Sequence, residues 1–362
     1  MPTDLRAWLL IVALGVVVVA GILLVLRRGE QDSPYGALSH GRRFRRRPHR
    51  DHFRQEDRLD EPPKRRIGVV VNPTKVADIA AVRRQVSRSC EMAGWGEPIW
   101  LETTAADPGY GQAQWAVEQG ASIVCPLGGD GTVRQVAMAL RGTEVPLGLL
   151  PGGTANLLAR NLDVPYDDID KALFVALTGQ NKRVDVGWIA VDDEPETMFL
   201  VMAGFGFDGA VMAQTTDEMK KVVGSAAYTV SGFRNWLSPR FKISFSVDGQ
   251  HPLTRRTRSV VIGNCGKIYG GLVLLPEARV DDGVLDAVII SPKGAVGWVN
   301  VFARVVTHNH KGHEQFDHHH GRDFVVTASE PQEAQVDGDS LGLVTKVTAR
   351  VEPGALLVRI GG

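Results

Sequence analysis

A single aspartate lies among three glycines in the stretch Leu127-Gly-Gly-Asp-Gly-Thr-Val133. An apolar run at 121–126 precedes this stretch and predicts a buried parallel strand, and a helical pattern follows from Val133 to Leu140. Glycines leave backbone N–H groups accessible at the start of that helix, where an anion such as phosphate is favoured. An ordinary strand-to-helix turn has the same composition, so this turn alone leaves both interpretations open. The turn consists of Gly128, Gly129, Asp130, Gly131 and Thr132.

A second turn of the same design follows along the chain. The apolar run Val145–Leu150 leads into Pro151-Gly-Gly-Thr154, after which a second helix is expected. Loops that follow adjacent parallel strands project from the same edge of a sheet. We therefore expect Gly152, Gly153 and Thr154 to face the first turn across one crevice, which favours a ligand site over two unrelated chain reversals.

Asp130 has a clear chemical use if the first turn receives phosphate. A carboxylate at that place would repel the ligand unless a divalent cation lies between them, and oxygen ligands favour Mg²⁺. The chain contains no Gly-x-x-x-x-Gly-Lys-Ser/Thr motif, which excludes a P-loop enzyme, and no Gly-x-Gly-x-x-Gly opens the first helix. Nicotinamide binding of the ordinary kind is therefore disfavoured.

The elements that must position these turns alternate between short apolar strands and amphipathic helices. Such a pattern predicts a parallel sheet with helices on both faces, here over residues 65–178. The polar ends of its strands should share one edge, and they include Asn72 and Thr104 as well as Asp130 and Thr154. Expected strands besides the two above are 67–71 and 98–101, and expected helices are 79–93 and 112–119.

After Gly179 the pattern changes to short, partly alternating apolar runs separated by turn residues. This pattern predicts antiparallel sheets packed as a β-sandwich over residues 179–362, with one helix near Asp217–Phe233 whose apolar stripe suggests core packing. The expected strands are 183–189, 198–202, 241–247, 259–262, 272–275 and 287–290.

Two groups of carboxylates stand out in this second part. Asp337 and Asp339 flank Gly338, so we expect both side chains on one face of a strand or loop, with Asp337 the preferred proton acceptor. Asp282 lies in the segment Arg279–Val284, where an Asp-Gly hairpin turn without metal is an equally good interpretation.

The order and spacing of four motifs resemble the catalytic domain of the diacylglycerol kinase and sphingosine kinase family, most closely its soluble bacterial lipid kinases. The motifs are Asn72-Pro73, Thr103-Thr104, Gly128–Thr132 and Pro151–Asn156, and the resemblance extends from Ile67 to the end of the chain. It implies a fold shared with NAD kinase and 6-phosphofructokinase, and it implies ATP as phosphate donor. The implied ATP contacts are Asn72, Thr104, Gly128, Gly129, Asp130, Gly131, Thr132, Gly152, Gly153 and Thr154.

Further residues gain a role only through this resemblance. It implies a structural Mg²⁺ held by the side chain of Asp282 and the carbonyls of Arg279 and Val284. The family usually has Asp-Gly-Glu where this chain has Asp337-Gly-Asp339, which shortens the second carboxylate by one methylene. The segments Gly204–Asp208 and Lys221–Tyr228 also resemble family motifs, and Asp208 either lines the site or closes a turn.

The implied reaction is phosphorylation of the hydroxyl of diacylglycerol, with Asp337, Asp339 and Asp130 as catalytic residues. A sphingoid-base kinase or another lipid kinase remains an alternative. NAD kinase is a further one, although the chain lacks the Asn-Glu dipeptide of the NAD kinase pattern. A non-catalytic lipid or nucleotide sensor is disfavoured because all three carboxylates are present.

The amino-terminal segment predicts a membrane anchor. Ala7–Leu26 carries no charge and is long enough to cross a bilayer as one helix, which favours a retained anchor over 1–28 rather than a cleaved signal peptide. Residues 29–64 are rich in arginine and predict a basic disordered tether. Its arginines either bind anionic lipid or are solvated. The basic residues after the anchor predict that the catalytic part faces the cytoplasm. A homodimer is left open.

Charge and cysteine content limit the remaining classes. The chain has 362 residues with 41 basic and 41 acidic side chains, so its net charge gives no reason to expect nucleic acid as a partner. Cys90, Cys125 and Cys265 are far apart in apolar or glycine-rich settings and predict small buried side chains in a reducing compartment. Six histidines predict a surface loop rather than a zinc site: His308, His310, His313, His318, His319 and His320.

Overall fold

The computed structural model describes residues 64–206, 240–268, 272–292, 297 and 316–362. Residues 65–362 pack as one compact unit. The expected anchor, nearly all of the tether, the helix near Asp217–Phe233 and Asp208 lie outside the described residues. No helix within the described ranges combines the length and apolar character needed to span a bilayer.

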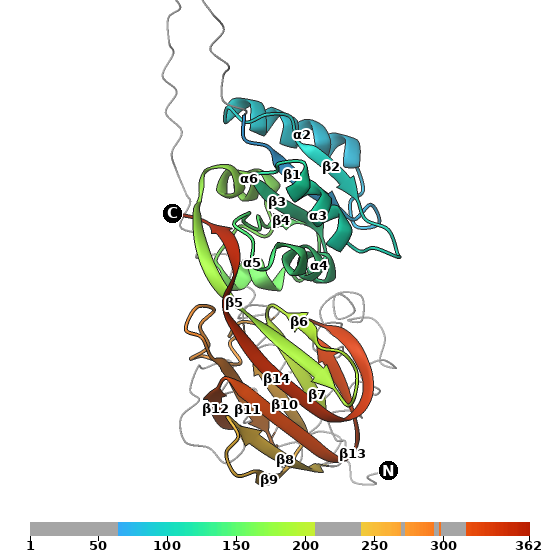
Figure 1. The fold of residues 1–362 in the computed structure, drawn as a ribbon, viewed down its shortest axis with the longest axis vertical. Helices are drawn as coiled ribbons and strands as arrows, with labels where there is room; N and C mark the ends of the chain where they lie inside the picture. Colours follow the sequence, from blue (N-terminus) through green and yellow to red (C-terminus); the bar gives the residue numbers. More distant parts are fainter. Residues whose placement is uncertain (1–63, 207–239, 269–271, 293–296, 298–315) are drawn as a thin grey trace, which may run out of the picture. The chain divides into compact units, whose positions relative to one another are not determined.

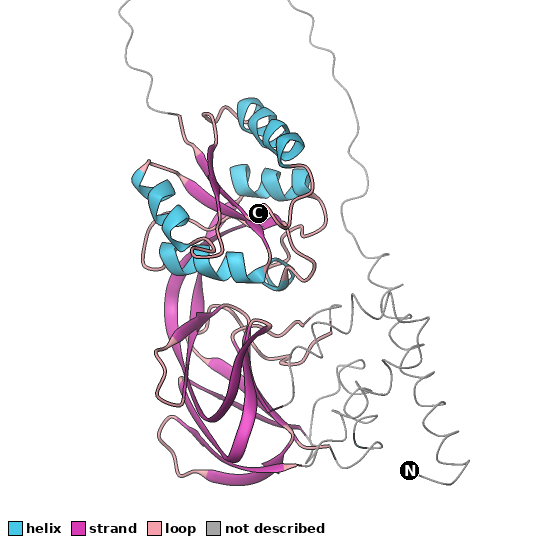
Figure 2. Cartoon of the chain, turned by 90° about the vertical axis from the view of Figure 1, so that its right-hand side faces the viewer, coloured by secondary structure: helices cyan, strands magenta, loops and turns pink. Residues whose placement is uncertain are grey.

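A four-stranded parallel sheet forms the first half of this unit, as the sequence predicts. Its strand order is β2-β1-β3-β4, and every neighbouring pair is parallel (Figure 1). The strands are β1 (Ile67–Val71), β2 (Ile99–Glu102), β3 (Ile123–Gly128) and β4 (Leu150–Pro151). The five residues of β1 are all buried because helices cover both faces of the sheet (Figure 2).

Two pairs of helices cover the two faces of the sheet. One face packs on α3 (Tyr110–Glu118) and α4 (Asp130–Leu140), whose apolar residues share a core with Val70 and Val124. The other packs on α2 (Ile79–Met92) and α6 (Ile169–Thr178), in a core that includes Val69. The alternation of strand residues between the two cores gives the predicted three-layer arrangement.

The strand predicted over Val145–Leu150 is much shorter in the structure. Only Leu150 and Pro151 form β4, while Leu147 makes isolated bridges to Val124 and to Val358. Pro146 has no N–H to donate, and the N–H of Leu147 donates to the carbonyl of Leu357 at 2.7 Å. This segment therefore divides its hydrogen bonds between the parallel sheet and the carboxyl-terminal strand.

The second half is a ten-stranded antiparallel sheet, which agrees with the predicted class. Its main path has the order β12-β11-β10-β7-β13-β14-β5-β6, with β8 paired to β13 and β9 to β8. The sheet folds over a second apolar core to which most of its strands contribute, from β11 to β6 along that path. The strands are β5 (Gln180–Val191), β6 (Thr197–Phe199), β7 (Met202–Gly206), β8 (Phe241–Val247), β9 (Leu253–Thr257), β10 (Ser259–Gly263), β11 (Leu285–Ile290), β12 (Phe316–Gly321), β13 (Asp323–Val336) and β14 (Asp339–Ile360).

Three details of this sheet correct the sequence prediction. The run 272–275 is not a strand and contributes only an isolated bridge between Lys267 and Val273. The predicted strand 198–202 is interrupted, since the N–H groups of Leu200 and Val201 bond a side chain instead of a neighbouring strand. His318–His320 lie in β12, paired with β11, and not in a loop; the other three histidines of the cluster lie outside the described residues.

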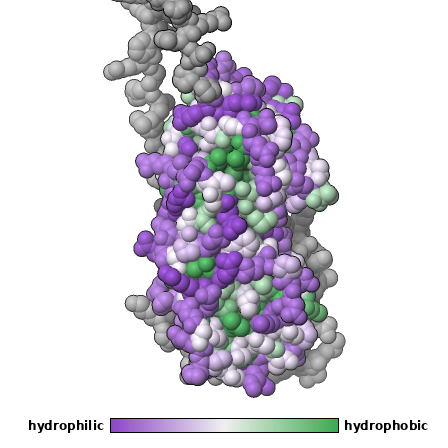
Figure 3. Space-filling view, viewed as in Figure 1, coloured by the Kyte–Doolittle hydropathy of each residue, from purple (hydrophilic) through white to green (hydrophobic). Residues whose placement is uncertain are grey.

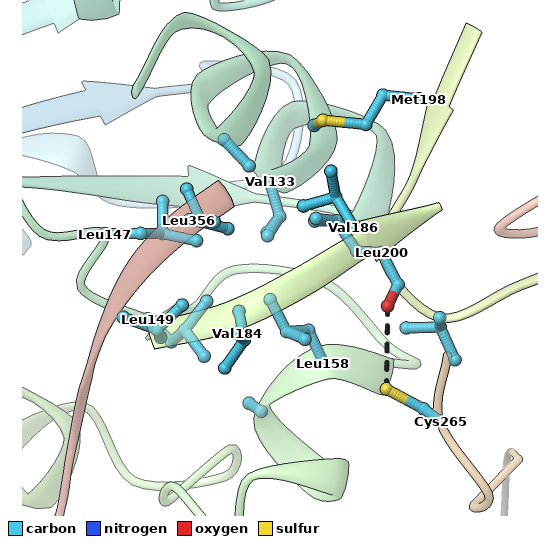
Figure 4. Packing of buried hydrophobic residues seen from close by; sticks show 14 of the residues in the cluster. Val133, Leu147, Leu149, Leu158, Val184, Val186, Met198, Leu200, Cys265 and Leu356 are labelled. Carbon is cyan, nitrogen blue, oxygen red and sulfur yellow. Dashed lines mark hydrogen bonds between the residues drawn. The ribbon is translucent and has the colours of Figure 1, made fainter. Parts of the chain in front are cut away.

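One apolar core joins the two halves. It contains Val133 of α4, Leu147, Val184 and Val186 of β5, and Leu356 of β14, which Figure 4 shows gathered in a single cluster. The N–H of Arg359 also donates to the carbonyl of Leu147. The two sheets are therefore fixed to each other by shared side-chain packing and by backbone hydrogen bonds.

The cysteines are part of the packed interior. All three are free and buried, and burial raises the pKa of the Cys90 thiol to about 11 and raises those of Cys125 and Cys265 further. They behave as the small buried side chains that the sequence predicts.

The face of the molecule in Figure 3 is mostly hydrophilic, with its exposed apolar residues in separate patches.

Candidate active site

The two glycine-rich turns lie against each other, backbone to backbone. Gly128 pairs with Pro151 in the parallel sheet, and a Cβ added to Gly152 would collide with the backbone of Gly128. A Cβ added to Gly153 would lie 2.8 Å from the Cα of Gly129. The absence of side chains at Gly152 and Gly153 is therefore a requirement of this close approach.

Asp130 begins helix α4 and reaches across to the second turn. Its Oδ1 accepts the backbone N–H of Leu157 at 2.7 Å, at the start of the short helix α5 (Leu157–Asn161). Burial raises the pKa of the Asp130 carboxyl to about 6; the hydrogen bond from Leu157 opposes this rise, and the negative charge of Asp337 adds to it.

Asn156 holds the second turn in shape. It adopts a left-handed backbone conformation with φ of 46°, which asparagine tolerates better than most residues. Its side-chain oxygen accepts the N–H of Gly153, and its amide nitrogen donates to the carbonyls of Gly153 and Tyr166. The loop that carries Thr154, which is exposed, is thereby fixed beside the first turn.

The remaining predicted ATP contacts lie at the same edge of the parallel sheet. Asn72 follows β1, and its N–H donates to the carbonyl of Leu127 at the end of β3. Thr104 follows β2, is exposed, and accepts the N–H of Asp107 on its hydroxyl at 3.0 Å. The structure thus brings all four polar strand ends to one edge, as parallel pairing requires.

Asp337 and Asp339 lie at the hairpin that joins β13 and β14. Val336 pairs with Asp339, so Asp337 and Gly338 are a two-residue turn, with φ of 46° and 94° as in a type I′ turn. The Asp337 carboxylate accepts the N–H groups of Leu200, Val201 and Met202 at 2.9–3.0 Å. Its side chain is 2% exposed, and burial raises the pKa of this carboxyl.

Asp339 differs from Asp337 in exposure and in surroundings. Its side chain is 59% exposed, and its Oδ2 would lie 3.4 Å from a Cβ added to Gly131 in the first glycine turn. The two carboxylates therefore differ in burial, although both lie near the same guanidinium, that of Arg134.

Sequence reasoning missed Arg134. It is buried on helix α4, where its guanidinium donates from Nη2 to Asp339 Oδ2 at 2.6 Å and from Nη1 to the carbonyl of Val336 at 2.9 Å. Nη1 also lies 3.9 Å from Asp337 Oδ2. The available signal was one charged residue between the apolar Val133 and Val136, on the face of a helix that packs inward.

The segment Arg279–Val284 forms a turn of its own. Asp282 is exposed, and its Oδ1 accepts the N–H of Val284 at 3.2 Å, while Gly283 has φ of 76° and donates its N–H to Asp185. Burial and the charges of Asp282 and Glu277 raise the pKa of Asp286 to about 6. Within the described residues no group of three or more His, Cys, Asp or Glu side chains is placed to hold a metal ion, so a cation here would depend on main-chain carbonyls.

Comparison of the sequence with known proteins identifies the family of this chain. Residues 66–189 match the diacylglycerol kinase catalytic domain, and residues 201–360 match the YegS C-terminal NAD kinase beta sandwich-like domain. The protein named "Probable lipid kinase YegS-like" from Pseudomonas aeruginosa (strain UCBPP-PA14) is 35% identical over 255 residues, which are 68% of this chain and 78% of that relative. Its namesake from Pseudomonas putida is 34% identical over 57% of this chain and 68% of that relative.

A solved structure supports the fold. A diacylglycerol kinase from Bacillus anthracis str. Sterne superposes with a TM-score of 0.60 at 19% identity, covering 83% of this chain and 98% of that chain. The fold of a parallel sheet with helices on both faces, followed by an NAD kinase-like sandwich, is therefore shared with that structure. The chain belongs to the family of YegS-like lipid kinases with a diacylglycerol kinase catalytic domain.

Proposed function

We propose that the protein is an ATP-dependent lipid kinase that phosphorylates the hydroxyl of diacylglycerol and releases phosphatidic acid. The observation that carries the proposal is the position of Asp339. This exposed carboxylate belongs to the second domain but lies at Gly131 of the first glycine turn. A proton acceptor from one domain thus meets a phosphate-binding turn from the other, which is the arrangement that phosphoryl transfer to an alcohol needs.

The glycine turns supply the phosphate site. The N-terminus of α4 and the backbone N–H groups of Gly129, Gly131 and Thr132 favour a triphosphate there. Asn72, Thr104 and Thr154 lie at the same edge and can contact the rest of the nucleotide. Asp130 is a hard oxygen donor inside that anionic site, which fits Mg²⁺; the cation would neutralise charge that develops on the transferred group.

Asp339 is better suited than Asp337 to take the proton of the acceptor hydroxyl. The Asp337 carboxylate is committed to three backbone N–H groups and is almost wholly buried. As the hydroxyl oxygen forms its bond to the γ-phosphorus, its proton passes to the Asp339 carboxylate, and the bond from the γ-phosphorus to the bridging oxygen of ADP breaks. Asp337 instead shapes the turn that presents Asp339.

The apolar amino-terminal segment fits a membrane substrate. A lipid alcohol is confined to the bilayer, and an anchor at residues 1–28 would raise the effective concentration of enzyme at its substrate. We propose that the catalytic part works at the cytoplasmic face, an orientation that the basic residues after the proposed anchor favour.

The test is phosphate transfer by the full chain in mixed micelles. Radiolabelled ATP is offered with Mg²⁺ and diacylglycerol, sphingosine, polyprenol or NAD, beside the Asp339→Asn variant as control. Label in phosphatidic acid that depends on Asp339 supports the proposal. Label confined to another lipid would support a lipid kinase with a substrate other than diacylglycerol. Label confined to NAD would overturn the proposal.

A further inference from the structure

Arg134 connects the two domains at the point where the proposed reaction takes place. Its two terminal nitrogens bond two acceptors on the β13–β14 hairpin, the carbonyl of Val336 and the carboxylate of Asp339. Residue 134 lies in the first turns of α4, directly after the glycine turn, while the acceptors are more than 200 positions away along the chain. The contact therefore fixes the hairpin relative to the glycine turn.

Stability alone does not explain this arrangement. The Arg134 side chain is 11% exposed, and its buried Nε has no hydrogen-bond partner among the described residues. A buried guanidinium loses its hydration, and replacing buried ion pairs with apolar side chains is often neutral or stabilising. A buried donor without a protein partner is unusual and calls for an explanation.

We propose that Arg134 is a positioning residue that sets the place of the Asp339 carboxylate at the first glycine turn. The inference rests on the proposed function and extends it. Asp339 is exposed and has negative neighbours in Asp337 and the incoming phosphates, so without a cation its side chain would turn toward solvent. The planar guanidinium holds the hairpin backbone and the carboxylate with two separate nitrogens in a fixed geometry, which the shorter and more flexible side chain of lysine does not reproduce.

The substitution Arg134→Lys tests the geometry and keeps the positive charge near the buried Asp337. We expect kcat to fall about a hundredfold, as for a reacting group displaced by about 1 Å, while KM for ATP changes by less than about threefold. Lysine is shorter than arginine, so the longer glutamate side chain of Asp339→Glu should restore contact between the carboxylate and the lysine ammonium group. The double variant should recover about tenfold of the lost kcat, a non-additive effect.

Arg141→Lys is the matched control. Arg141 lies at the other end of α4, about 10 Å along the helix, and its Nη1 also pairs with the second domain, at 2.8 Å from Glu352 Oε2. This pair is far from the glycine turns, so kcat should stay within about twofold of wild type. A kcat for Arg134→Lys equally close to wild type would overturn the proposal, as would a loss that Asp339→Glu does not relieve.

A second measurement separates this inference from the proposed function. Melting temperatures are compared for wild type, Arg134→Lys, Asp339→Asn and the double variant without substrate. If the shifts in melting temperature are non-additive, the side chains of Arg134 and Asp339 interact in the folded protein. This result supports the inference even if wild type phosphorylates no lipid and the proposed function fails. Additive shifts would show that the side chains do not interact and would overturn the inference whatever the activity.

Discussion

The carboxylate of Asp130 and the backbone N–H of Leu157 are joined by a hydrogen bond of 2.7 Å between Oδ1 and N. This bond ties the aspartate of the first glycine turn to the helix that follows the second, so the two turns are held as one unit. Burial nevertheless raises the pKa of Asp130 to about 6. The carboxylate that we propose as a ligand of Mg²⁺ thus lies at a place where its negative charge is costly.

This relationship predicts that Asp130→Asn stabilises the protein at neutral pH. A folded pKa of about 6 lies above the value near 3.8 of a free aspartate, so folding binds extra protons between these values. The stability from the protonated carboxyl is fully present below about pH 4 and is lost as pH rises through about 6. The shift of roughly 2 pKa units corresponds to at most about 3 kcal/mol.

Urea unfolding without Mg²⁺ or nucleotide, at several pH values, measures this effect. The unfolding free energy of Asp130→Asn should nearly equal that of wild type near pH 4, exceed it increasingly as pH rises through about 6, and then stay constant up to pH 8. Phosphate transfer by the same variant should fall by several orders of magnitude. A stability difference that does not change with pH would show that the Asp130 carboxyl does not titrate as its burial implies.

Asp337 and Asp339 should respond in opposite ways to substitution. Asp337→Asn would set an NH₂ group against backbone N–H donors in a buried site, which should cost about 2–3 kcal/mol of unfolding free energy. Asp339→Asn keeps an acceptor for Arg134 on an exposed side chain and should cost less unfolding free energy than Asp337→Asn, yet lower kcat by a factor of about 100 to 10,000.

Thermal unfolding and phosphate transfer, measured on both variants, decide between the two roles. If Asp337→Asn folds with wild-type stability but is inactive, Asp337 is the proton acceptor after all. Full activity of Asp339→Asn would remove Asp339 from the reaction.

The Arg279–Val284 turn should bind Mg²⁺ if the family resemblance holds for these residues. We expect saturating Mg²⁺ to raise the melting temperature by a few degrees without nucleotide, as about 1 kcal/mol of binding free energy would do. Asp282→Asn should abolish this rise, and Asp130→Asn should keep it. An equal rise in Asp282→Asn would leave Asp282 as an ordinary turn residue, bonded to the N–H of Val284.

The sequence was informative where one local signal determines structure. Continuous apolar runs such as Ile67–Val71 predict strands covered on both faces, and the glycine turns mark where those strands end. Parallel pairing then brings Asn72, Thr104, Asp130 and Thr154 to one edge without further information. These predictions need only periodicity and the geometry of a parallel sheet.

Long-range contacts were not predictable in the same way. Which of Asp337 and Asp339 is buried depends on the N–H groups of Leu200, Val201 and Met202, more than 130 positions earlier in the chain. Arg134 resembles an ordinary helix residue until the hairpin from the other domain is placed beside it. We predicted a loop for His318–His320 because three consecutive polar side chains show no apolar alternation. These residues nevertheless form part of a strand that pairs with β11.

Substitutions at two glycines of the two glycine-rich turns should distinguish an effect on packing from an effect on phosphate binding. Gly152→Ala places a methyl group against the backbone of Leu127 and Gly128, which cannot yield as a flexible side chain would, and should cost about 1–3 kcal/mol of unfolding free energy. Gly129 has an ordinary φ of −81°, and a Cβ added there meets no atom of the described residues within 4 Å. Gly129→Ala should therefore fold normally. Its methyl group would lie where the phosphates approach the backbone, so we expect KM for ATP to rise at least tenfold, which corresponds to about 1.4 kcal/mol of lost binding free energy. Urea unfolding and ATP saturation curves measure the two effects, and a Gly129→Ala variant with wild-type KM would show that the triphosphate does not bind at this turn.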